Sequence, residues 1–108
     1  MRASEIAETA AKLVSGEREA QHGTKMRNFG NIAELWTSYL RIRRDPGAPL
    51  DQEDVGHMMV LLKIARTQLG KYNPDDHFDM VGYAACAGEV AWEISDAAAG
   101  FRRVDEGG

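Results

Sequence analysis

The chain has 108 residues, a formal net charge of −4 and one cysteine. This length fits a single domain with a modest core, and the lone cysteine excludes an intrachain disulfide, as expected for a cytoplasmic protein. The 13 basic residues are too dispersed for an extended nucleic-acid surface. We expect no secretory signal and no membrane-spanning segment, and therefore small molecules or proteins as partners.

The first half of the chain predicts two helices. Apolar residues at helical spacing indicate a short helix that follows the N-cap Ser4 and reaches Val14. The polar, glycine-bounded segment 16–23 is interpreted mainly as a loop. A second helix is expected over residues 25–43, before the turn sequence Asp45-Pro46-Gly47. Its apolar stripe consists of Met26, Phe29, Ile32, Ala33, Trp36, Tyr39 and Leu40.

The third expected helix has the clearest start signal. Asp51 and Asp54 have the spacing of a capping box, with aspartate in place of glutamate. The helix should reach Gly70, which suits the residue just after a helix. Apolar residues cover much of its circumference, which is typical of a central helix.

The fourth helix should start near Asp75 or Asp76 and run to about Ala99, with Gly100 ending it. Its stripe and its small residues predict close packing against a neighbouring helix. The stripe consists of Met80, Tyr83, Ala87, Val90, Ala91, Ile94 and Ala98.

Every long periodic segment has the helical period, so the sequence predicts an all-α, four-helix bundle-like single domain over residues 1–101 with a short N-terminal helix. Residues 102–108 are expected to form a flexible tail. Because so small a core leaves little stability, we expect a homo-oligomer.

Two carboxylates lie within the apolar stripe of the fourth helix. Asp76 and Asp79 are three residues apart, on the same side as Met80 and Tyr83. Inward-facing carboxylates need a partner or a metal ion, which marks them as candidate site residues. The alternative is that Asp75 or Asp76 caps the helix, but a cap does not explain Asp79.

Glu53, Asp54 and His57 form a second cluster on the first turns of the third helix. They are either a capping box with an exposed polar start or ligands of Mg²⁺ or Mn²⁺. The third and fourth helices should be antiparallel, so their N-termini lie at opposite ends. Either a dimer brings the two acidic clusters together, or they belong to different sites.

Lys63 and Arg66 form a basic pair on the third helix, level with the start of the fourth. They are either structural partners of Asp76 or Asp79 or groups that bind phosphate. The polar segment before the second helix is either a solvated loop or the wall of a ligand pocket. Its candidate binding residues are Arg18, His22 and Asn28, to which Tyr83 is added because its hydroxyl could contact a ligand.

Three blocks of the sequence are similar to motifs of a known protein family. They run from Asn28-Phe29 to Trp36, from Asp54-Val55 to Arg66, and from Asp79 to Ala85. In these blocks the chain resembles a family of small uncharacterised phage and prophage proteins, over roughly residues 4–95.

More distantly, the chain is similar to MazG-type all-α nucleoside triphosphate pyrophosphohydrolases, which hold Mg²⁺ with E-E-x-x-E on one helix and E-x-x-D on a later one. The resemblance implies Mg²⁺ or Mn²⁺ as cofactor and Glu53, Asp54 and Asp79 as catalytic residues. The implied metal ligands are Glu53, Asp54, His57, Asp76 and Asp79. A histidine, His57, replaces one glutamate and Asp76 replaces another, and having fewer negative ligands implies weaker metal binding.

Three hypotheses for the function follow. The first is a metal-dependent pyrophosphohydrolase, with Lys63, Arg66 or Arg18 balancing the phosphate charge. The second is a protein that binds a nucleotide or a nucleotide-derived defence signal without cleaving it. The third is a module that binds a host protein through a helix face. Nucleotide binding or cleavage is our main expectation.

Overall fold

The computed structural model of the chain describes residues 1–15 and 24–107. Within these ranges it consists of helices without strands, so the predicted all-α class is confirmed. The helices are α1 (Ala3–Leu13), α3 (Lys25–Ile42), α4 (Gln52–Thr67) and α5 (Pro74–Gly107). None of these described helices is long and apolar enough to cross a membrane.

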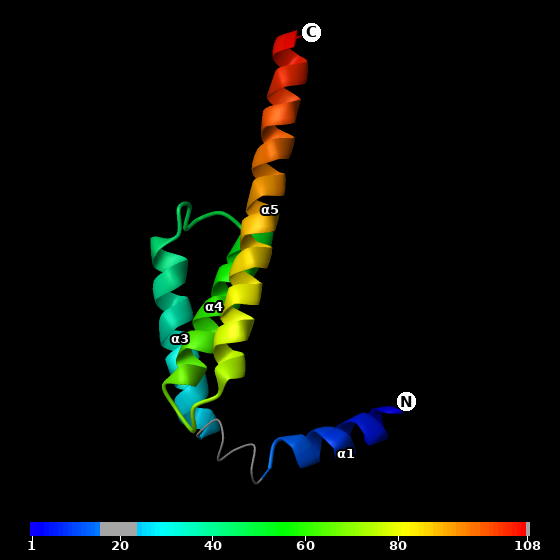
Figure 1. Cartoon of the computed structure of the whole chain (residues 1–108), viewed down its shortest axis with the longest axis vertical. Helices are drawn as coiled ribbons and strands as arrows, with labels where there is room; N and C mark the ends of the chain where they lie inside the picture. The colour runs from blue at the N-terminus through cyan, green and yellow to red at the C-terminus, as the bar shows by residue number, and fades with distance from the viewer. Residues whose placement is uncertain (16–23, 108) are drawn as a thin grey trace.

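Helices α3, α4 and α5 pack side by side, and α4 contacts both of the others. Neighbouring helices are antiparallel, so the start of α3, the end of α4 and the start of α5 lie at one end of the bundle (Figure 1). Helix α1 lies apart from this bundle, and all its residues are exposed. The packed core is therefore formed by three helices, and the expected fourth does not join it.

The predicted start of α1 is wrong. The helix begins at Ala3, so Ser4 lies inside it and Arg2 is the N-cap. The backbone carbonyl of Arg2 accepts hydrogen bonds from the N–H groups of Glu5 and Ile6. Ile6 and Leu13 are half exposed, because none of the other helices in residues 24–107 covers their stripe.

Helix α3 spans nearly the predicted range. The Thr24 hydroxyl accepts the Arg27 N–H at its start. Ile32 is buried, but Met26 and Phe29 are exposed, contrary to the expectation that they join the core. The Trp36 indole N–H donates to the Met58 carbonyl at 2.7 Å, which fixes α3 against α4.

The capping box at the start of α4 is confirmed, since Asp51 and Asp54 each accept the other's backbone N–H at 2.9 Å. The helix ends at Thr67, earlier than predicted, while Gly70 has a φ of 72°, the left-handed conformation that favours glycine. Helices α4 and α5 approach each other closely at Gly56. A Cβ there would lie 2.6 Å from the Ala87 Cβ.

Helix α5 is longer than predicted. It begins with Pro74 and continues to Gly107, so the expected end at Gly100 is wrong. A glycine inside a helix costs only about 1 kcal/mol, which neighbouring helix formers can offset. The Asn73 side chain accepts the Asp75 N–H at 3.0 Å, so Asn73 caps this helix and the expectation that Asp75 or Asp76 does so is wrong.

Candidate functional site

The acidic residues proposed as metal ligands lie in two groups at opposite ends of the bundle. Glu53 and Asp54 are at the start of α4, and Asp76 and Asp79 are at the start of the antiparallel α5 (Figure 1). Among the described residues, no three histidine, cysteine or carboxylate side chains come together as a metal site. A single chain therefore does not gather the five proposed ligands, in agreement with the antiparallel geometry expected from the sequence.

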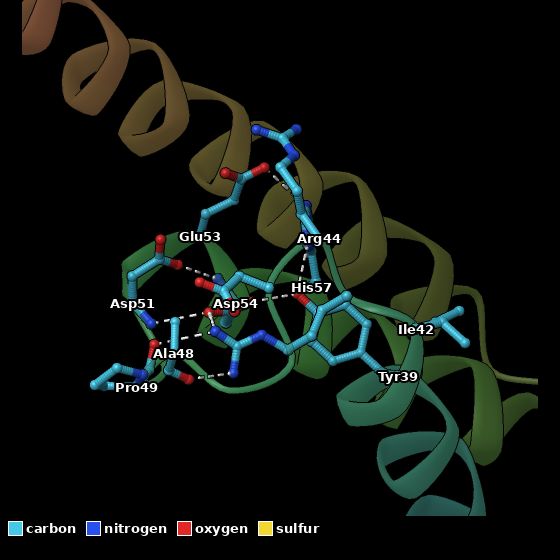
Figure 2. A pocket seen from close by; sticks show the side chains of 11 residues that line it. Tyr39, Ile42, Arg44, Ala48, Pro49, Asp51, Glu53, Asp54 and His57 are labelled. Atoms are coloured by element: carbon cyan, nitrogen blue, oxygen red, sulfur yellow. Dashed lines mark hydrogen bonds and ion pairs between the residues drawn. The ribbon is translucent and has the colours of Figure 1, made fainter.

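The first group is part of a network that we call the Tyr39 cluster, made of Tyr39, Arg43, Glu53, Asp54 and His57. The Tyr39 hydroxyl donates to Asp54 Oδ1 at 2.6 Å and lies 3.0 Å from His57 Nδ1. Since a hydroxyl has one hydrogen, His57 Nδ1 must be the donor in the second contact. Figure 2 shows these side chains directed toward one another.

Arg43 completes the Tyr39 cluster. Its guanidinium lies 3.2 Å from Asp54 Oδ2 and donates to the carbonyls of Ala48 and Pro49 at 2.9 and 3.0 Å. One cation therefore joins the end of α3, the connecting loop and the start of α4. Arg43 was not among the candidates predicted from the sequence, because a basic residue just before a turn gives only a weak signal for such a role.

The Tyr39 cluster shifts two ionisation equilibria. The hydrogen bond from Tyr39, followed by the Asp51 N–H, lowers the pKa of Asp54 below its ordinary value of 3.8. Burial, followed by the hydrogen bond to Asp54, raises the pKa of Tyr39 to about 12. Asp54 is therefore ionised and Tyr39 neutral at neutral pH.

The Tyr39 cluster borders an open pocket of about 540 Å³. Glu53 and His57 are partly exposed members of the cluster, and His57 Nε2 lies 3.5 Å from Glu53 Oε2. Asp54 is buried, and both its oxygens accept hydrogen bonds from protein groups. Its carboxylate thus has a structural role that a metal ligand would have to give up.

The second group lies at the other end of the bundle, and we call it the polar end: Asn28, Lys63, Arg66, Asp76 and Asp79. Lys63 Nζ lies 2.8 Å from Asp79 Oδ2, so the expected ion pair between α4 and α5 is confirmed. The Lys63 side chain is buried, whereas that of Asp79 is 46% exposed. Asp79 is therefore paired on one side and accessible to solvent on the other.

The polar end also contains buried polar groups without partners. Asn28 and Asp76 are 6% and 5% exposed. Neither Asn28 Oδ1 nor the buried Arg66 Nε has a hydrogen-bond partner within the described part of the chain. Buried polar atoms are normally paired, and unpaired ones indicate strain or a missing ligand. All five polar-end residues were candidates predicted from the sequence, although from separate patterns.

The other candidate residues lie elsewhere or are not described. Tyr83 is half-buried on α5, one helical turn after Asp79. Arg18 and His22 lie outside the described residues. The candidate site is therefore the polar end, formed by the start of α3, the end of α4 and the start of α5.

Comparison with known proteins shows the family. Residues 5–91 match the family described as domain of unknown function DUF6378, and the chain belongs to it. The Gene 55 protein of Mycobacterium phage D29 is 36% identical over 85 residues, which cover 79% of this chain and 52% of that protein. The Gene 55 protein of Mycobacterium phage L5 is 39% identical over 79 residues, which cover 73% of this chain and 47% of that protein.

The chain thus spans about half the length of these curated phage relatives. No solved structure matches it. The resemblance to a phage protein family is confirmed, and the more distant MazG resemblance stays a prediction.

Proposed function

From the geometry of its polar end, we propose that the protein binds a nucleotide through its phosphate groups, together with a divalent cation. The observation that carries the proposal is the pair of unsatisfied buried atoms, Asn28 Oδ1 and Arg66 Nε, beside charged side chains at one end of the bundle. A ligand that supplied both an acceptor and a positive charge would satisfy them.

Arg66 and Lys63 are the groups that would hold phosphate oxygens. Arginine offers planar donors that bind phosphate in a bidentate manner, and lysine acts as a point charge. Arg66 Nε lacks a protein acceptor among the described residues, so a phosphate oxygen could accept the hydrogen bond that the protein leaves unmade. Lys63 is already paired with Asp79 and would contribute mainly through its charge.

The oxygen donors of the polar end fit Mg²⁺ that arrives with a nucleotide. Magnesium in proteins is commonly held by one or two carboxylates, with phosphates and waters completing its shell. Asp76 and Asp79 are the carboxylates, one buried and one partly exposed, and Asn28 Oδ1 is an unpaired neutral oxygen. Too few donors are present for a preformed all-protein cage.

Nucleotide pyrophosphohydrolysis is the second candidate. It is favoured by the i, i+3 spacing of Asp76 and Asp79, of which the first is buried although it caps no helix. A bound Mg²⁺ or Mn²⁺ would supply an activated water. In that reaction the two carboxylates would position the cation, while Arg66 and Lys63 would balance the charge on the phosphates.

The binding proposal is tested by calorimetric titration with the four deoxynucleoside triphosphates and their ribose counterparts, in Mg²⁺ and in EDTA. We expect Arg66→Gln to weaken binding about 10-fold or more, as for loss of a charge-assisted hydrogen bond. Arg44→Gln changes an exposed arginine at the opposite end and should bind like the wild type. Absence of binding across the panel, or equal affinity of the Arg66→Gln protein, would refute the proposal.

The cation and the reaction are tested with a matched pair of neighbouring aspartates. Asp76→Asn should remove the dependence of binding on Mg²⁺, whereas Asp75→Asn, at an exposed position, should retain it. Chromatographic detection of pyrophosphate and a nucleoside monophosphate, lost in the Asp76→Asn protein, would establish hydrolysis. Binding without product at high protein concentration would leave a nucleotide-binding protein and exclude the second candidate.

A further inference from the structure

Helix α5 has an apolar face that none of the other described helices covers. Phe78, Val81 and Trp92 are 71%, 70% and 67% exposed. Ala85 and Gly88 lie between them and are also exposed. We call these five residues the α5 seam. Large exposed apolar side chains grouped on one face indicate an interaction surface rather than scattered surface residues.

The residues of the α5 seam repeat at intervals of three and four, the spacing of the contact positions of a coiled coil. At its centre, Ala85, the seam faces away from α4. Ala87 packs on α4, and Ala85 is two residues away, which turns the two side chains about 160° apart on a helix of 3.6 residues per turn. The α5 seam is thus a second apolar stripe, opposite the one that holds α5 in the bundle.

The chain exposes more surface than a compact protein of its size, and the difference is surface that association could bury. The chain exposes 8283 Å², whereas a compact protein of its mass of 11.9 kDa exposes about 5,900 Å². Its radius of gyration is 18.7 Å, against about 13 Å for a compact domain of this length. The excess of about 2,300 Å², to which the exposed helix α1 also contributes, exceeds the roughly 800 Å² that each partner buries in a standard interface.

We propose that a second copy of this chain covers the α5 seam, with the two α5 helices antiparallel about a two-fold axis at Ala85. The order large, small, large in Phe78, Ala85 and Trp92 has equal spacing on both sides of Ala85. In this arrangement Phe78 packs against Trp92 of the partner subunit, and the alanines allow close approach at the axis. A two-fold interface requires such a self-complementary patch.

The antiparallel direction also follows from charge. The first turn of α5 contains the exposed Asp75, and a parallel pair would place the carboxylates of its two copies beside each other. An antiparallel pair separates them and opposes the helix dipoles favourably. This inference does not depend on the proposed function, because the α5 seam contains none of the polar-end residues.

The dimer is tested by light scattering of the full chain after size exclusion. We expect a mass about twice 11.9 kDa for the wild type and a single-chain mass for Val81→Lys, with unchanged helical circular dichroism. Val55→Lys is the matched control, because Val55 is also half exposed or more but lies on α4 outside the seam. A monomeric wild type, as expected if α1 or a further segment covered the seam, would overturn the proposal, and so would a dimer that Val81→Lys leaves intact.

Cross-linking provides a measurement that does not disrupt the interface. In a Cys86→Ser background, Ala85→Cys should form an interchain disulfide, because the two copies meet at the axis. Ser95→Cys should not, since an antiparallel pair separates the two copies of this position by about 30 Å along the helix. A parallel pair would cross-link at both positions and a different interface at neither, and either result would contradict the proposed arrangement.

Discussion

Asp54 has both carboxylate oxygens engaged by groups from three parts of the chain. Tyr39 donates from α3, Arg43 pairs with it from the end of that helix, and the Asp51 N–H closes the capping box. A buried carboxylate is stable only with such partners. The Tyr39 cluster therefore uses one charge to hold the end of α3 and the start of α4 in a fixed relation.

Asp54→Asn should lower the free energy of unfolding by about 1–3 kcal/mol near pH 7, because it leaves Arg43 without its charged partner. The folded pKa of Asp54 is lowered, so its stabilisation is complete above the ordinary value of 3.8 and is lost as the pH falls through the folded pKa. Urea unfolding at a series of pH values should show the difference between wild type and variant shrinking below 3.8.

The control is Asp75→Asn, which changes an exposed aspartate on the first turn of α5. Its unfolding free energy should stay close to that of the wild type across the series. A difference between wild type and Asp54→Asn that does not change with pH would show that the Asp54 carboxylate contributes no pH-dependent stability.

At the scale of the helices, the contact between α4 and α5 depends on small side chains. Gly56 and Ala87 face each other so closely that an added Cβ would lie 3.1 Å from the Ala87 backbone Cα as well as against its Cβ. A side chain at position 56 therefore cannot be accommodated by a rotamer change, and the two helices would have to separate.

Gly56→Ala should destabilise the protein by about 1–3 kcal/mol, because overpacking outweighs the gain in helix propensity of about 1 kcal/mol. Gly82→Ala is the matched control, since nothing lies within 4 Å of the added Cβ. This substitution should therefore show only the gain in helix propensity. Thermal unfolding followed by circular dichroism should move the melting temperatures in opposite directions. Equal shifts would mean that the α4–α5 distance is not set by Gly56.

Local patterns and a contact across a short connection could be predicted from the sequence, whereas contacts that depend on a loop path or on a covering partner could not. The capping box at Asp51 and Asp54 and the Lys63–Asp79 pair follow from spacing within helices and from short connections. The role of Arg43 depends on the path of the loop that it binds. The exposure of Phe29 was not predicted, because an apolar stripe does not reveal whether its neighbour is in the same chain.

At the scale of the whole molecule, the isolated chain has a small core. Only Ile32, Ala65 and Ala87 are buried apolar residues within the described part of the chain, and the molecule extends over 63 × 36 × 27 Å. Figure 1 shows the later part of α5 projecting beyond α3 and α4. Such a chain gains much of its stability from association if the α5 seam is covered by a second copy.

The melting temperature should therefore rise with protein concentration, because dimerisation stabilises the folded state by mass action. Differential scanning calorimetry over about a 100-fold range of protein concentration, with a melting temperature determined at each concentration, measures this dependence. Val81→Lys should melt at a lower and concentration-independent temperature, while Val55→Lys should follow the wild type. A wild-type transition that does not move with concentration would indicate that folding is complete in the monomer.

The hydrogen bonds from Arg43 to the carbonyls of Ala48 and Pro49 also affect the susceptibility of the chain to proteolysis. The Asp45-Pro46-Gly47 turn is exposed and follows two arginines, so it has the composition of a readily nicked loop. A protease needs an extended stretch of backbone, and here the Arg43 guanidinium holds residues 48 and 49, just after the turn, against the end of α3. Cleavage beside Arg43 must wait for this corner of the molecule to open locally.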